Sequence, residues 1–207
     1  MKAVYCGLAV LLIGLSFNAS AAGDAAAGQT KSIVCSACHG VDGNSSVPMW
    51  PKLAGQHESY LVRQLQLIQS GKRTVPEMAA LVSAMSEQDM ADISAYYASQ
   101  AMAPGIAETG KLQLGQSLYR AGNPETGTPS CSSCHGPNGQ GNPVSGYAVL
   151  AGQHATYIDK SLKKFRATNA YGEDDEPSAV MSGVVRLLSD EEIAALSSYI
   201  QGLHVVE

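Results

Sequence analysis

Residues 35–39 read Cys-Ser-Ala-Cys-His, and residues 131–135 read Cys-Ser-Ser-Cys-His. Both segments have the spacing C-x-x-C-H, the attachment signature of c-type haem. Two thiols three residues apart on a helical turn reach the two vinyl groups of one porphyrin, and the next residue points its imidazole at the iron. The spacing therefore predicts two covalently bound haem c groups. The attaching residues are Cys35 and Cys38 for haem 1 and Cys131 and Cys134 for haem 2.

Two other interpretations of the four cysteines compete with haem attachment. They could form one structural zinc site, or each C-x-x-C pair could be a redox-active disulfide. A zinc site leaves the adjacent His39 and His135 unexplained. Disulfide chemistry normally accompanies a βαβ context, and the chain shows no convincing run of alternating apolar residues. Haem attachment accounts for all six side chains, so we expect His39 and His135 to bind the two irons.

The first residues have the pattern of an export signal. Lys2 supplies a positive start, residues 3–15 are apolar but too few to span a bilayer, and residues 19–21 are small. We expect residues 1–21 to be a signal peptide cleaved near Ala21/Ala22. An uncleaved N-terminal anchor is the alternative.

Composition narrows the class of protein further. Of the 207 residues, 45% are hydrophobic and 15% are charged, which is typical of a globular chain. Aromatic residues make up only 6%, so a bound cofactor would help to fill the core. The formal net charge of −5 argues against nucleic acid as a partner.

The second half of the chain repeats the first. The segment Leu-Ala-Gly-Gln-His at residues 53–57 returns at residues 150–154. Together with the two haem motifs, this predicts a tandem duplication with one haem in each copy. We expect the two domains to span residues 22–100 and 111–207, joined by a linker at residues 101–110 that is rich in turn-forming residues.

Each copy has helical rather than strand patterns, so the predicted fold class is all-α, with each domain wrapped around its haem. The predicted helices span residues 25–37, 58–70, 86–100, 112–121, 156–166 and 189–201. Loops rich in Gly, Pro and Asn, such as residues 136–146, are expected to cover the haem. We also expect Tyr96 and Tyr199 to pack where helices cross at Gly28 and Gly115.

The duplication also points to the sixth iron ligand. From residue 111 onward the only methionine is Met181, which lies eight residues before the helix-capping Ser189. In the first copy Met78 lies eight residues before the capping Ser86, and Met85 is the alternative. A thioether is a soft ligand, and His/Met ligation raises the reduction potential of a haem. The predicted axial pairs are His39 with Met78 and His135 with Met181.

Other polar residues have weaker signals. His57 and His154 match each other, and we expect each to cap a helix or to form a hydrogen bond near a haem edge, with iron ligation as the alternative. His204 is expected to face solvent. The acidic residues 173–176 are expected to form a solvated loop, and the alternative is a docking patch for a basic partner.

The chain resembles the bacterial cytochrome c4 family of di-haem class I cytochromes c. The resemblance covers essentially all of the chain after the predicted signal peptide. It rests on both C-x-x-C-H motifs, both Leu-Ala-Gly-Gln-His segments, residues 76–78, Met181 and residues 197–204. It implies two tandem cytochrome c domains with their haems close together across the interface, and it implies Met78 and Met181 as axial ligands.

The resemblance also implies a function. The expected protein is a periplasmic carrier, often loosely attached to the inner membrane, that passes electrons from a respiratory donor complex to a terminal oxidase. With two His/Met irons there is no open site for a small-molecule substrate, so we expect outer-sphere electron transfer and no enzymatic activity. The alternatives are a di-haem enzyme, such as a peroxidase or dehydrogenase, and an electron-accepting subunit of a periplasmic dehydrogenase.

Overall fold

The computed structural model describes residues 22–167, 170–172 and 174–204. The predicted signal peptide lies outside these residues. Within them the structure is helical and contains no strand, with two isolated β-bridges in loops of the second half. None of the described helices combines the length and apolar character needed to cross a bilayer. The predicted all-α class is confirmed.

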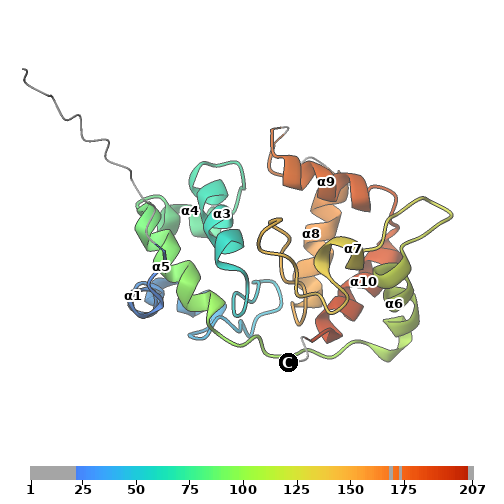
Figure 1. The fold of residues 1–207 in the computed structure, drawn as a ribbon, viewed down its shortest axis with the longest axis horizontal. Helices are drawn as coiled ribbons and strands as arrows, with labels where there is room; N and C mark the ends of the chain where they lie inside the picture. The colour runs from blue at the N-terminus through green and yellow to red at the C-terminus, as the bar shows by residue number, and fades with distance from the viewer. Residues whose placement is uncertain (1–21, 168–169, 173, 205–207) are drawn as a thin grey trace, which may run out of the picture.

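The helices form two groups that lie side by side and are joined by one extended segment (Figure 1). The first group consists of α1 (Ala25–Lys31), α2 (Ile33–His39), α3 (Glu58–Gln69), α4 (Pro76–Val82) and α5 (Glu87–Ala98). The second consists of the 3₁₀ turn η1 (Thr109–Lys111), α6 (Leu112–Ala121), α7 (Ser132–His135), α8 (Ala155–Ala167), α9 (Glu176–Val185) and α10 (Asp190–Gly202). From α1 and α6 onward the helices of the two groups correspond one to one, as the sequence repeat predicts.

Two features of the helices differ from the sequence-based expectation. The predicted helix at residues 25–37 is two helices, α1 and α2, which meet at Ser32. Helices α4 and α9, which carry the candidate methionines, were not predicted at all. Each has a proline in its first turn, Pro76 in α4 and Pro177 in α9. A proline interrupts a helix interior but is favoured at its start, so these prolines begin helices.

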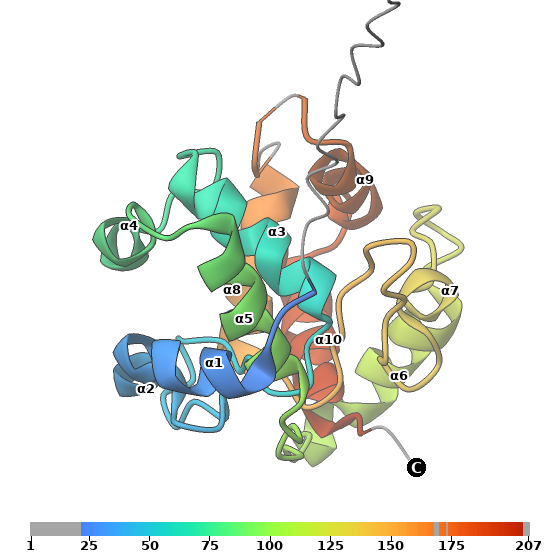
Figure 2. The same ribbon diagram turned by 60° about the vertical axis from the view of Figure 1, so that its left-hand side comes forward.

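Close helix crossings hold each group together. In the first, α1 crosses α5 so closely that a Cβ on Gly28 would lie 1.9 Å from the Asp92 carbonyl oxygen and 2.9 Å from the Tyr96 Cβ. In the second, a Cβ on Gly115 would lie 2.3 Å from the Ala195 carbonyl oxygen and 2.7 Å from the Tyr199 Cβ. The predicted pairing of a glycine with a tyrosine at both crossings is confirmed, and Figure 2 shows α1 against α5.

Adding a methyl group at either crossing should destabilise its domain. We expect Gly28→Ala or Gly115→Ala to lower the free energy of unfolding by about 1–3 kcal/mol or more, because the helix backbones must move apart. The matched control is Gly183→Ala in α9, where a Cβ meets nothing within 4 Å. That change should raise stability by about 0.5–1 kcal/mol through helix propensity. Denaturant unfolding measures all three; equal effects at the three sites would contradict the close-packing argument.

Three hydrophobic clusters organise the interior. The first domain is built on Leu61, Ile93, Tyr96 and Tyr97, and the second on a larger set that includes Leu118, Tyr119, Ile193, Leu196 and Tyr199. A third cluster joins the two groups, because Leu67 of α3 packs with Ala170 and Tyr171 of the second domain. The two domains therefore share buried apolar surface as well as a linker.

Candidate haem sites and the domain interface

The histidines of the two C-x-x-C-H motifs are held in the same way. His39 ends α2 and His135 ends α7, and their exposed fractions are only 6% and 8%. The Nδ1 atom of His39 lies 2.9 Å from the Pro51 carbonyl oxygen, and Nδ1 of His135 lies 2.9 Å from that of Ala148. Donation of an Nδ1–H to each carbonyl fixes the ring and leaves Nε2 as the free lone pair, the arrangement of a metal-binding imidazole. Burial lowers the pKa of both histidines, which favours the neutral form that binds metal.

The motif cysteines are thiols rather than disulfides. All four are unpaired in the structure, and Cys35 and Cys131 pack against the cores of their domains. Burial raises the pKa of Cys35, and it raises the pKa of Cys131 to about 11. A redox-active C-x-x-C pair instead has a lowered thiol pKa, so these sites lack the character of a dithiol catalyst. They fit covalent attachment of a haem beside a prepared imidazole.

The candidate methionines occupy equivalent places. Met78 lies in α4 and Met181 in α9, and both are partly buried. Each stands four residues before a fully buried valine, Val82 in α4 and Val185 in α9. Residues four apart share one face of a helix, so both methionines lie on the face that their helix turns toward the domain.

The rival methionine has a different counterpart. Met85 corresponds to Leu188, a buried core residue of the second domain, and Met85 itself packs against the core of the first. A leucine cannot bind iron, so this position reads as core packing in both copies. The structure brings Met181 and Cys131 to one cluster, whereas Met78 is not among the residues packed against the cluster of Cys35.

Two buried glutamines clasp the domains together. The Gln56 side chain accepts from the Val149 backbone N–H and donates to the Val149 carbonyl, with both distances 2.9 Å. Gln153 forms the same pair of bonds with Lys52, again at 2.9 Å. Both glutamine side chains belong to residues only 4% exposed. These four bonds form a reciprocal contact, the glutamine clasp, in which the repeated segment Leu-Ala-Gly-Gln-His has the same role in both domains. Sequence reasoning did not assign these glutamines a role.

Of the two expectations for the following histidines, the structure contradicts helix capping at His57, and a hydrogen bond near a haem edge stays a prediction. His57 occupies the N-cap position of α3, but its side chain makes no capping hydrogen bond. The His154 Nε2 atom lies 2.7 Å from the Ser45 carbonyl oxygen, which belongs to the other domain. His154 therefore bonds across the domain interface instead of capping a helix. His204 is exposed, as expected.

Both domains anchor the linker. The side chain of Asn44 bonds to the Ala101 carbonyl and to the Ala103 N–H, at 2.9 and 2.7 Å, and the Lys52 Nζ donates to the Ala103 carbonyl at 2.6 Å. On the other side, Gln201 donates to the Ile106 carbonyl. Residues 101–110 therefore form a strap along the interface rather than a loose tether.

The acidic run before α9 contributes to the interface as well. Of its members, Glu173 lies outside the described residues. Asp175 is buried, accepts from the Ser178 N–H at 3.0 Å as the N-cap of α9, and forms an ion pair with Arg63 of the first domain. Burial raises the pKa of this carboxyl, but the bonds from Arg63 and Ser178 outweigh burial and hold it below its usual value. The prediction of a wholly solvated loop was therefore wrong for Asp175.

The ion pair of Asp175 makes stability depend on pH. Because the pKa of Asp175 is depressed in the folded state, its contribution to the free energy of unfolding is present above about pH 4 and is lost as the pH falls through the folded pKa.

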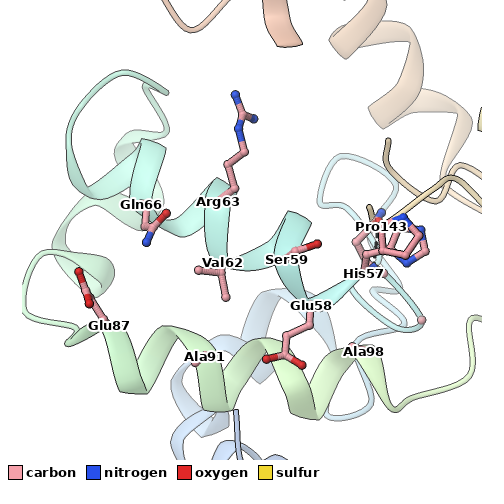
Figure 3. Close-up of a pocket in the computed structure, with 12 residues that line it drawn as sticks. His57, Glu58, Ser59, Val62, Arg63, Gln66, Glu87, Ala91, Ala98 and Pro143 are labelled. Atoms are coloured by element: carbon pink, nitrogen blue, oxygen red, sulfur yellow. Dashed lines mark hydrogen bonds between the residues drawn. The ribbon is translucent and has the colours of Figure 1, made fainter. Parts of the chain in front are cut away.

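A surface groove of about 660 Å³ lies between α3 and α5 (Figure 3). Glu58 and Arg63 project from α3, Glu87 comes from α5, and His57 and Pro143 lie together at one end. None of the predicted haem-binding residues lines this groove. It is therefore a separate feature of the surface.

Comparison with known proteins agrees with this geometry. The cytochrome c family model matches residues 21–101 and again residues 112–204. Cytochrome c4 of Pseudomonas aeruginosa is 50% identical over 195 residues, which cover 94% of this chain and 96% of that protein. The crystal structure of reduced recombinant cytochrome c4 from Pseudomonas stutzeri has a TM-score of 0.84 at 48% identity, covering 88% of this chain and all of that one.

A more distant relative is a thiosulfate dehydrogenase electron acceptor of Stutzerimonas stutzeri, 31% identical over 81% of this chain and 77% of that protein. The cytochrome c matches cover both halves of the chain, and each half contains one C-x-x-C-H motif with a buried, oriented histidine. The chain carries covalently bound haem c in two domains, transfers electrons rather than catalysing a reaction of its own, and belongs to the cytochrome c4 family.

Proposed function

We propose that this cytochrome is a periplasmic carrier that moves electrons between a respiratory donor complex and a terminal oxidase, through two six-coordinate His/Met haems. The supporting observation is the matched set of ligands in the two copies. Each has a buried histidine with its Nδ1 bonded to a carbonyl, and each has a methionine one helical turn before a buried valine. The proposed haem-binding residues are Cys35, Cys38, His39 and Met78 in the first domain and Cys131, Cys134, His135 and Met181 in the second.

The chain itself has three tasks in such a carrier. When bound, haem c supplies a one-electron Fe(III)/Fe(II) couple. His39 and His135, held by their carbonyl partners, would each supply one ligand to an iron, and Met78 and Met181 would each supply a second. The apolar clusters beside the cysteines exclude water, which favours the less charged iron state. With two protein ligands at each iron, electrons would enter and leave without a bound substrate.

The compartment follows from the start of the chain. Cleavage of the predicted signal peptide near Ala21/Ala22 would release the mature protein into the periplasm, where c-type attachment takes place. Loose membrane association would then depend on the surface of the folded domains or on a partner. Fractionation of cells, followed by N-terminal sequencing of the mature protein, tests both parts of this proposal.

A second candidate is service as the electron acceptor of one periplasmic dehydrogenase. The observation that favours it is the relative described as a thiosulfate dehydrogenase electron acceptor. The two candidate functions differ in whether the cytochrome forms a lasting complex with a dehydrogenase. Gel filtration of the protein from its native membrane and periplasmic fractions would show a stable complex with a dehydrogenase for the second candidate, and a free protein for the first.

The first experiment on the carrier proposal is optical. The exported protein should give a sharp low-spin c-type spectrum when reduced, and carbon monoxide should leave that spectrum unchanged. The oxidised protein should show the weak red band of methionine bound to Fe(III). A shift with carbon monoxide, or a high-spin component, would mean that at least one methionine is not a firm ligand, and would overturn the proposed ligation.

A further inference from the structure

Arg73 is a partly buried cation whose hydrogen-bond partners are all neutral. It lies in the segment between α3 and α4. One guanidinium nitrogen donates to Gln64 Oε1 at 2.7 Å, a second donates to the Tyr157 hydroxyl at 3.0 Å, and the Tyr171 ring centroid lies 5.7 Å from the guanidinium carbon. Among the ion pairs of the described residues, none involves Arg73.

The groups around Arg73 have unused donors. A guanidinium has five N–H groups, and the two bonds to Gln64 and Tyr157 use only part of them. Gln64 is 6% exposed, and its Nε2 has no hydrogen-bond partner in the described part of the chain. Tyr157 accepts from Arg73, so its own O–H proton remains available. The Arg73 cation and the unused donors of Gln64 and Tyr157 lie in one partly buried place, which is unfavourable unless an anion accepts from them.

Among its described residues, the second domain contains no such cluster. The repeat aligns Tyr60 with Tyr157 and therefore Gln64 with Ser161, whose hydroxyl bonds to the Tyr157 carbonyl at 2.8 Å. No lysine or arginine stands between Arg166 and Met181. Arg166 itself is bonded to the Leu188 carbonyl and to Asp190. A cluster of donors that an anion would satisfy is therefore found in only one of the two copies.

The position of Arg73 indicates which haem is concerned. Arg73 precedes the proposed ligand Met78 by five residues, in the segment that leads into α4. Its partner Gln64 lies in α3, so both residues belong to the domain that contains Cys35, Cys38 and His39. The propionates of haem c are carboxylates that the polypeptide does not supply, and they match the donor set in charge and geometry.

We propose that Arg73, Gln64 and the Tyr157 hydroxyl together bind a propionate of the haem attached to Cys35 and Cys38. This inference rests on haem binding and not on the carrier role, so it stands whichever redox partner is found. Because Tyr157 belongs to the second domain, the propionate site spans the domain interface. Arg73 thus acts as a positioning residue that also adds positive charge beside one iron.

If Arg73 binds this propionate, the reduction potential of haem 1 should depend on Arg73, and that of haem 2 should not. A positive charge beside the iron stabilises the reduced state, and it keeps the propionate ionised. In Arg73→Gln, the haem of the first domain should become easier to oxidise. The difference from the unmodified protein should be largest at high pH, where the propionate is ionised, and should shrink at low pH, where protonation of the propionate compensates for the lost cation.

The test is a potentiometric titration of the full holoprotein between pH 5 and 9, with the two haems assigned by proton NMR. At pH 8 we expect Arg73→Gln to shift the oxidised-to-reduced ratio of haem 1 at least tenfold, which is 59 mV for a one-electron couple. The ratio at haem 2 should change less than threefold. The matched control is Lys72→Gln, which removes the same charge from the neighbouring exposed residue and should shift neither haem by more than threefold.

A second variant tests the same site without removing charge. Tyr157→Phe should leave the haem 1 potential unchanged at high pH, and should move the pH at which that potential begins to rise to a higher value. If Arg73→Gln fails to accumulate as holoprotein, Tyr157→Phe still tests the proposed propionate site. Equal shifts in Arg73→Gln and Lys72→Gln, a larger shift at haem 2, or a Tyr157→Phe profile identical to that of the unmodified protein would overturn the proposal.

Discussion

Replacing Met181 by alanine should open the second haem, and only that haem, to carbon monoxide. The thioether is the proposed sixth ligand, and no other methionine exists in the second domain to take its place. The reduced variant should therefore bind carbon monoxide at half of its haem, and its oxidised spectrum should gain a high-spin component. Met181 also packs against the core of its domain, so we expect a loss of stability of about 2–5 kcal/mol.

A histidine at the same position separates ligation from packing. Met181→His should restore a low-spin, six-coordinate iron that no longer binds carbon monoxide. Its reduction potential should fall by a sizeable part of the roughly 0.8 V range over which axial ligands act. If Met181→Ala binds no carbon monoxide and keeps its potential, the second haem has another sixth ligand and the proposed ligation of both copies fails.

The first domain provides the matched comparison. Met78→Ala should open the first haem, as Met181→Ala opens the second. Met85→Leu should leave both spectra unchanged and should alter stability by less than about 1.5 kcal/mol, because Leu188 already fills the equivalent place in the other copy. Carbon monoxide binding by Met85→Leu, but not by Met78→Ala, would reverse the assignment in the first domain.

The features that the sequence predicted are those encoded by local spacing or by the repeat. The two C-x-x-C-H motifs, the all-α class and the glycine–tyrosine crossings at Gly28 and Gly115 follow from residues close in sequence or from matched positions in the two copies. The capping boxes of α5 and α10 follow in the same way. The duplication also favours Met78 over Met85 as the proposed ligand, because Met85 corresponds to a leucine in the second copy, an argument that a single domain could not supply.

What escaped prediction depends on contacts between the domains. The roles of Gln56 and Gln153 require a partner backbone about a hundred residues away, and no local period or motif indicates it. The ion pair of Asp175 with Arg63 has the same character, since an acidic run resembles a solvated loop until its partner is known. Helices α4 and α9 were missed for a local reason, because a proline near a short apolar stretch fits both a helix start and a loop.

The glutamine clasp gives the second large expected effect. In the double variant Gln56→Leu, Gln153→Leu, the backbone N–H and carbonyl groups of Val149 and of Lys52 lose their buried partners. A buried polar group left without a partner costs roughly 1–3 kcal/mol, so a closed interface would contain four such groups. Opening of the interface lets water reach all four. The domains should therefore separate while each keeps its own fold and its low-spin spectrum.

Small-angle scattering and limited proteolysis measure this separation. The double variant should show a larger radius of gyration and faster cleavage within residues 101–110, because the strap is exposed when the domains part. Each single variant should show about half of the increase in radius of gyration and in cleavage rate, since the two glutamines form equivalent pairs of hydrogen bonds. Gln66→Leu, an exposed glutamine on α3, is the control and should behave as the unmodified protein.

The same variants show which contacts fix the position of the two haem domains relative to each other. If electron exchange between the haems slows in the double variant while each reduction potential stays within about 59 mV, a tenfold ratio, the clasp sets the geometry between domains and not the chemistry of either iron. If the double variant instead keeps its compact scattering and its resistance to protease, the remaining contacts hold the interface alone. Those contacts include the apolar cluster of Leu67 with Ala170 and Tyr171, and the polar pairs Arg63 with Asp175, Arg73 with Tyr157, and His154 with the Ser45 carbonyl. Each polar pair includes a charged or titratable side chain, so an interface that then loosens with salt or pH depends on these pairs, whereas the apolar cluster and the neutral glutamine clasp respond to neither.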